Sequence, residues 1–221
     1  VGSVRSGKFA WARIGPESDA PLGSTCIDSL LEYLVEDMGY KDRSVALGFE
    51  APLFLPVPPN SGELSAGRKG EGQYSMFAPS GAAVTTLGLH ETAWVLRSLR
   101  QRLGEENEAI TYLVDSSAWL QASDRQELLL WEAFVAGDAH AGRDGGTSHM
   151  CDAVTAADCF RQYEGDWPVN SGVRTDAPLS VVHAAALWAG WAEDLERLHQ
   201  GCLVLKPETP FSGPIETVAV V

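Results

Sequence analysis

Three acidic residues stand within or next to apolar segments, where clustered carboxylates could hold a metal ion. Glu50 ends the apolar run at 44–50, Glu132 lies inside a second run at 128–135, and Asp152 lies near the start of a helix expected over 148–163. Mg²⁺ and Mn²⁺ prefer hard oxygen ligands such as carboxylates. We therefore expect Glu50, Glu132 and Asp152 to be metal ligands and catalytic residues, with Mg²⁺ or Mn²⁺ as the cofactor.

Each of these acids also has an alternative role. Asp152 in the first turn of a helix would complement the helix dipole. Glu50 would pair with an arginine or cap a turn, because buried charges are rarely left unpaired. For Glu132 the secondary structure itself is ambiguous: Asp124-Arg-Gln-Glu127 resembles a helix-capping box, but apolar residues on all sides of 128–135 favour a buried strand. We predict a strand there.

The remaining pattern predicts how these acids are positioned. The nearly continuous apolar run at 44–50 is typical of a parallel strand covered on both faces, and ligand sites in such sheets lie at the carboxyl ends of strands. Gly39 is the expected stop of the first helix and Asp176 the expected cap of the last. Further strands are expected at 8–14, 109–114 and 202–205, and helices at 24–38, 89–103 and 178–199.

This alternation predicts one α/β domain over 1–221. Its core is expected at about 1–163, and a C-terminal helical extension at about 176–206. The Gly- and Ser-rich segment 60–80 is expected to be a long loop, of the kind that is often functional.

Composition limits the classes of function. The chain has a net charge of -14, from 30 acidic and 16 basic residues, which argues against a general nucleic-acid coat. A nuclease is still compatible, because bound cations reverse the local sign of charge. The four cysteines include no Cys-x-x-Cys pair, and no signal peptide or membrane-length apolar run is present. We expect reduced thiols, a cytoplasmic location and no membrane partner.

Four segments together resemble the RNase H-like superfamily, and most of all its "predicted RNase H-like nuclease" branch. They are Gly-Ser-Val-Arg-Ser-Gly-Lys-Phe-Ala-Trp-Ala at 2–12, Gly-Phe-Glu-Ala-Pro-Leu at 48–53, Trp-Glu-Ala-Phe at 131–134 and His-Met-Cys-Asp-Ala-Val-Thr-Ala-Ala at 149–157. The resemblance implies an RNase H-like mixed sheet flanked by helices, here with an extra C-terminal helix. It also implies that acids from the first strand, the fourth strand and a later helix gather at one end of the sheet.

Carried over to this chain, the resemblance makes Glu50 the strand acid, Asp152 the helix acid and Glu132 a candidate third ligand. The first-strand acid would precede Gly2 and has no counterpart in this sequence. The implied chemistry is phosphodiester hydrolysis by two ions about 3.5–4 Å apart. Arg68 and Lys69 would then contact substrate phosphate.

The opening Gly2-Ser-Val-Arg-Ser-Gly7 also resembles the phosphate-cradling turn of actin-like ATPases and sugar kinases, which makes Ser3 a candidate substrate-binding residue. A complete kinase needs a second lobe, and this chain is too short for one. The expected partner is nucleic acid or a nucleotide. A homodimer is a candidate assembly as well, through the tryptophan-bearing helix at 178–199.

The alternative function is a non-catalytic RNase H-like module that binds a nucleotide or a protein partner. If the three carboxylates lie close together in space, the metal-dependent nuclease is favoured. If they lie apart, the binding module is favoured.

Overall fold

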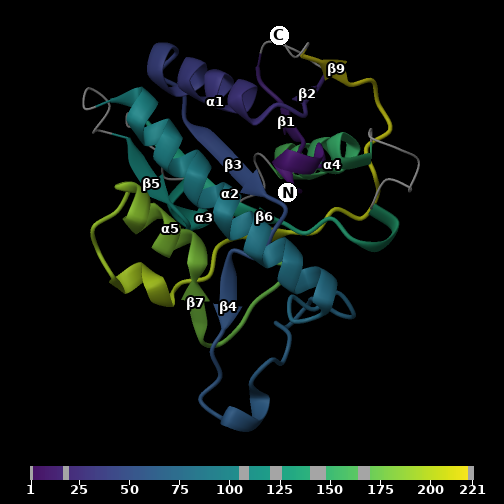
Figure 1. The fold of residues 1–221 in the computed structure, drawn as a ribbon, viewed down its shortest axis with the longest axis vertical. Coiled ribbons are helices and arrows are strands. Elements are labelled where there is room, and N and C mark those ends of the chain that lie inside the picture. The colour runs from purple at the N-terminus through teal and green to yellow at the C-terminus, as the bar shows by residue number, and fades with distance from the viewer. Residues whose placement is uncertain are drawn as a thin grey trace.

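The centre of the protein is a parallel β-sheet. The computed structural model describes residues 2–16, 20–104, 110–119, 126–139, 148–163 and 170–218. The sheet consists of β3 (Val45–Phe49), β5 (Thr111–Leu113), β6 (Glu127–Ala133) and β8 (Val204–Leu205). All of these strands are parallel: β3 pairs along one edge of β6, while β5 and β8 share the other edge, at its amino and carboxyl halves respectively (Figure 1).

Two smaller sheets complete the β-structure. β1 (Trp11–Arg13) is antiparallel to β2 (Leu22–Ser24), which pairs in parallel with β9 (Glu216–Thr217). β4 (Phe54–Pro56) is antiparallel to β7 (Pro178–Ser180). The strands predicted at 44–50 and 128–135 are thus confirmed nearly to their bounds. Those predicted at 8–14, 109–114 and 202–205 are confirmed only over 11–13, 111–113 and 204–205, and residue 109 lies outside the described residues.

Side chains of β6 alternate between two hydrophobic clusters, one on each face of the sheet. Leu128 and Leu130 pack with α1 (Ile27–Val35), α2 (Pro79–Leu103) and α5 (Val181–Ala189). Leu129, Trp131 and Ala133 pack with Ala156, Cys159 and Phe160 of α4 (Ser148–Gln162). The fold is therefore a three-layer α/β arrangement, in which side-chain direction changes face at every residue of the strand.

Three predicted helices have different bounds. α2 begins at Pro79 rather than residue 89, because proline suits the first helical position, and it ends at Gly104 as expected. α1 does not stop at Gly39: it passes into a π-helical turn over Glu36–Tyr40, which buries Asp37 and Met38.

The helix predicted at 178–199 is interrupted. Residues 178–180 form β7, Ser180 caps α5 in place of Asp176, and α5 ends at Gly190, which has a left-handed φ of 81°. The remaining described helical turns are short: η1 (Val4–Ser6), η3 (Ser61–Glu63), α3 (Ser116–Trp119), η5 (Gly137–Ala139) and η6 (Glu196–His199).

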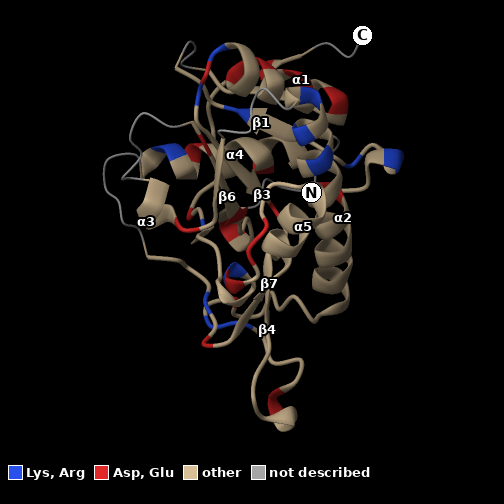
Figure 2. Ribbon diagram, turned by 90° about the vertical axis from the view of Figure 1, so that its left-hand side faces the viewer, with Lys and Arg blue, Asp and Glu red and all other residues tan. Residues whose placement is uncertain are grey.

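Charged residues of both signs are interspersed over the surface in the view of Figure 2. Among the described residues, no helix is long and apolar enough to cross a membrane. Trp188 on α5 is 59% exposed, with the guanidinium of Arg97 4.6 Å from the centre of its ring. The homodimer through this helix stays a prediction.

Gly48 on β3 leaves room for a large side chain of the neighbouring strand β6. It pairs with Trp131 of β6, and a Cβ at Gly48 would overlap the indole ring. We predict that Gly48→Ala lowers the free energy of unfolding by about 1–3 kcal/mol, because the ring must move within a packed cluster. Urea denaturation measures this change. In the control Gly62→Ala, where the nearest atom to the new Cβ lies 3.4 Å away, we expect no loss of stability; equal losses in the two variants would contradict the prediction.

Candidate functional site

Glu132 lies at the carboxyl end of the central strand and is almost completely buried. Its neighbours in the sheet are Phe49 of β3 and Val204 of β8, and its side chain is 1% exposed. An ionised carboxylate in such a position is costly unless charge or hydrogen-bond donors compensate it.

Arg68 supplies that compensation. Its Nη1 donates to Oε2 of Glu132 at 2.7 Å and its Nη2 to Oε1 at 2.6 Å, so the pair is bidentate. Nε donates to Glu71 Oε1 at 2.7 Å, and the backbone N–H of Leu53 donates to Glu132 Oε2 at 2.9 Å. The guanidinium also lies over the ring of Phe54, 4.5 Å from its centre. We call Glu132, Arg68 and Glu71 the Arg68 cluster.

The electrostatics of the Arg68 cluster follow from its burial. Removal from water raises the pKa of Glu132, and the hydrogen bonds and positive charge of Arg68 oppose that rise. Burial and the negative charge of Glu132 together raise the pKa of the nearby Cys202 thiol, which is therefore a poor nucleophile. The cluster attaches the loop before α2 to the carboxyl edge of the sheet.

This arrangement changes the roles expected of Arg68 and Glu132. Arg68 is only 3% exposed and donates to protein groups, so it does not lie at the surface where a substrate phosphate would reach it. Both oxygens of Glu132 accept hydrogen bonds from Arg68. Lys69, in contrast, is exposed and donates to Asp176 at 2.7 Å.

The structure does not bring Glu132 to Asp152. Glu132 follows Leu128 and Leu130 on the face of β6 that α2 and α5 cover, whereas α4, which carries Asp152, packs on the face of Leu129 and Trp131. Because neighbouring strand residues point to opposite faces, the two carboxylates belong to opposite sides of the sheet.

Glu50 and α4, however, border one cavity. Glu50 directly follows β3 at the carboxyl edge of the sheet and is half-buried. It lines a pocket of about 730 Å³ together with Ala153, Ala156 and Ala157 of α4. Asp152 adjoins Ala153 on this helix and is 1% exposed.

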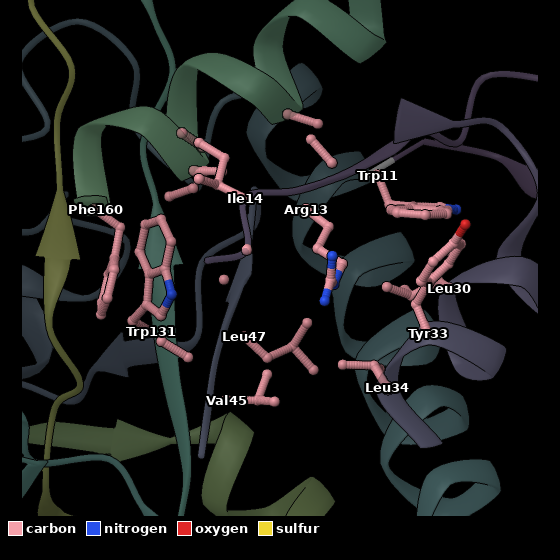
Figure 3. A pocket seen from close by; sticks show the side chains of 18 of the residues that line it. Trp11, Arg13, Ile14, Leu30, Tyr33, Leu34, Val45, Leu47, Trp131 and Phe160 are labelled. Carbon is pink, nitrogen blue, oxygen red and sulfur yellow. The ribbon is translucent and has the colours of Figure 1, made fainter. Parts of the chain in front are cut away.

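The pocket lies between β1 and β3 and has apolar walls. Figure 3 shows Leu30, Tyr33 and Leu34 of α1 on one side of it and Trp131 and Phe160 on the other. At one end Asp37 accepts two hydrogen bonds of 2.7 Å from Arg13 and one of 3.2 Å from Arg43. Glu50 lies at the other end, because β3 runs from Val45 beside Arg43 to Phe49 beside Glu50.

The expected tight turn at Gly2–Gly7 is present. Ser3 caps η1 by accepting a hydrogen bond from the N–H of Ser6 at 3.3 Å, and Gly7 has a left-handed φ of 66°. The hydroxyl of Ser3 thus takes part in the turn itself, and its contact with a substrate stays a prediction.

Among the residues that the structure describes, no group of three or more His, Cys, Asp or Glu side chains could hold a metal ion. Of the three predicted acids, Glu50 lines the pocket, and Asp152 is buried on α4 next to helix residues that line it.

The Arg68 cluster was not predicted from the sequence. Two signals for it exist: a single acid inside an apolar strand requires a partner, and Arg68 and Glu71 are opposite charges three residues apart. Neither signal identifies Arg68 as the partner of Glu132, because the two residues are 64 positions apart in the chain.

We predict that Arg68→Ala lowers the free energy of unfolding by about 3–5 kcal/mol, because it leaves Glu132 and Glu71 buried without their cation. Denaturant unfolding measures the loss. The neighbouring variant Lys69→Ala is the matched control, and it should unfold like the parent since its ion pair with Asp176 is exposed. A loss in Arg68→Ala as small as that of the control would show that the cluster is hydrated in solution.

Comparisons with known proteins found no matching family model, no curated relative and no similar solved structure. The α/β class therefore rests on the topology of the sheets and helices, and the resemblance to the RNase H-like superfamily stays a prediction.

Proposed function

We propose that this chain is a divalent-metal-dependent phosphodiesterase of the RNase H-like type that acts on nucleic acid. Glu50 and Asp152 would hold Mg²⁺ or Mn²⁺. The observation that carries the proposal is that Glu50, at the carboxyl edge of the sheet, and the α4 residues next to Asp152 border the same pocket. Carboxyl edges of parallel strands are where α/β folds place their ligands.

The donor set suits one hydrated ion better than a pair of ions. Mg²⁺ commonly keeps several water ligands and is held by one or two carboxylates together with substrate phosphates. Glu50 and Asp152 supply that number. Glu132 is left out of the proposed ligand set, because both of its oxygens accept from Arg68. When bound, such an ion would lower the pKa of a coordinated water and so supply the nucleophile.

Lys69 is the residue that we propose for phosphate binding. It is adjacent to Arg68, and hence close to the carboxyl edge of the sheet, and its ammonium group is exposed. Its partner Asp176 is also exposed and forms a weak surface pair that a phosphate group can replace. Ser3, on the turn before β1, is kept as a second proposed contact.

The second candidate is a non-catalytic module that binds a nucleotide or a protein partner. One observation favours it: the most deeply buried acid at the carboxyl edge, Glu132, is already neutralised by Arg68. A site that has one acid fewer than expected is easier to reconcile with binding than with two-metal hydrolysis.

Thermal unfolding with Mn²⁺ separates the two candidates. We predict that the parent chain is stabilised by about 2.7 kcal/mol at an ion concentration one hundred times the dissociation constant, because only the folded state holds the ion. Asp152→Asn and Glu50→Gln should each remove this stabilisation. The same samples, incubated with single- and double-stranded DNA and RNA, should show cleavage by the parent alone.

Asp158→Asn is the matched control for Asp152→Asn. Asp158 lies on the same helix and pairs with Arg161 and Gln162, so its substitution should keep the response to Mn²⁺. No response in the parent, or an equal response in all variants, would reject the metal site and leave the binding module.

A further inference from the structure

Three exposed cations lie on neighbouring segments at the carboxyl edge of the sheet. Lys69 and Arg174 exchange two backbone hydrogen bonds, of 2.9 and 3.0 Å, as an isolated antiparallel pair. Nζ of Lys206 donates to the carbonyl of Gly70 at 2.7 Å, and a Cβ on Gly172 would lie 2.9 Å from Cδ of Lys206. We call Lys69, Arg174 and Lys206 the cationic surface.

The cationic surface carries more positive charge than the protein neutralises. Residues that exchange both hydrogen bonds point their side chains to the same face, so Lys69 and Arg174 repel each other. Asp176 accepts from Lys69 at 2.7 Å. Lys69 and, to a lesser extent, Arg174 lower the pKa of Asp176, which is therefore ionised at neutral pH. Even with the one net negative charge of the buried Arg68 cluster, the balance of three cations and Asp176 stays positive, and a bound anion would relieve the repulsion.

Two aromatic rings continue the cationic surface. Nζ of Lys206 lies 4.9 Å from the centre of the Phe134 ring, and the rings of Phe134 and Tyr74 meet edge-on with their centres 6.5 Å apart. Tyr74 is 46% exposed. Cations that contact backbone phosphates, next to an aromatic ring that stacks on an unpaired base, are the combination that holds single-stranded nucleic acid. A duplex gains nothing from Tyr74, because its bases already stack on one another.

The cationic surface is close enough to Glu50 for one strand to reach both. At the carboxyl edge, Glu132 of β6 is next to Phe49 of β3 on one side and to Val204 of β8 on the other. Glu50 and Lys206 follow these two outer strands directly. Their backbones therefore stand two strand spacings apart, which is about 10 Å.

We infer that the cationic surface and Tyr74 bind a single-stranded nucleic acid. Lys69, Arg174 and Lys206 each contact a phosphate of its backbone, and the ring of Tyr74 stacks on one of its bases. This inference deepens the proposed function and rests on it, because it says which form of nucleic acid enters the site. The binding itself needs no metal ion.

Fluorescence anisotropy with a labelled single strand of mixed sequence tests the inference, on the whole chain and with EDTA present to remove divalent ions. The logarithm of the binding constant should fall against that of the salt concentration with a slope of about −2, because three phosphates contribute about 0.7 each. Arg174→Ala and Lys206→Ala should each change the slope to about −1.4 and weaken binding about fivefold. No binding by the parent, or binding that depends on neither residue, would overturn the inference.

Lys41→Ala is the matched control for Lys206→Ala. Lys41 is also an exposed cation, but it precedes β3 at the amino edge of the sheet and pairs with Glu36 at 2.7 Å. Its substitution removes the same charge and should leave the affinity and the salt slope as in the parent. An equal loss in the two variants would show that position on the surface does not matter, and it would overturn the inference.

Variants of Tyr74 test the preference for a single strand. Tyr74→Ala should weaken single-strand binding about tenfold, whereas Tyr74→Phe keeps the ring and should bind like the parent. A duplex of the same sequence should bind the parent about tenfold more weakly than the single strand does, and Tyr74→Ala should not change its affinity. Equal binding of the two forms, or displacement of the strand by heparin together with unchanged binding in Tyr74→Ala, would assign the surface to polyanions in general and overturn the inference.

Cleavage in Mn²⁺ separates this inference from the proposed function. Single-strand binding with the expected salt slopes but without cleavage would support the cationic surface and reject the phosphodiesterase. Cleavage of single strands that Arg174→Ala and Lys206→Ala leave unchanged would support the phosphodiesterase and overturn the role of the cationic surface.

Discussion

The bidentate pair of Arg68 and Glu132 is the interaction on which the carboxyl edge of the sheet depends. Glu132 stands where β3, β6 and β8 meet, and it also accepts from the N–H of Leu53, at the start of the segment that leads to β4. Arg68 belongs to a loop that would otherwise have few buried contacts. A buried ion pair of this kind adds little stability over an apolar replacement, but breaking it is costly. Its effect is to fix where the loop lies.

This constraint divides the carboxyl edge into two parts. On the face covered by α2 and α5, the Arg68 cluster fills the space with one arginine that pairs with two carboxylates. Beside β3, the pocket next to Glu50 has α1 on one side and α4 on the other, and its walls are apolar.

The elements of the central sheet were predictable because their patterns are local. A short, continuous apolar run suits a strand covered on both faces, and 44–50 and 128–135 both proved to be such strands. The helix at 148–163 was found nearly to its bounds. The helix at 178–199 was too long, because its apolar spacing continues past Gly190, where a left-handed φ ends α5. The spacing of apolar residues does not reveal where a left-handed residue ends a helix.

The sequence by itself determined the α/β class, the parallel strands and the positions of Glu50 and Asp152 on a strand end and a helix. These features depend on periodicity and on local turn chemistry, which adjacent residues encode. Only the tertiary structure decided which charges meet. Glu132 pairs with Arg68, which is 64 positions away in the chain. Because successive residues of β6 point to opposite faces of the sheet, Glu132 lies on the face opposite α4. The pocket between β1 and β3 is likewise a property of packing, since its lining residues come from segments far apart in the sequence.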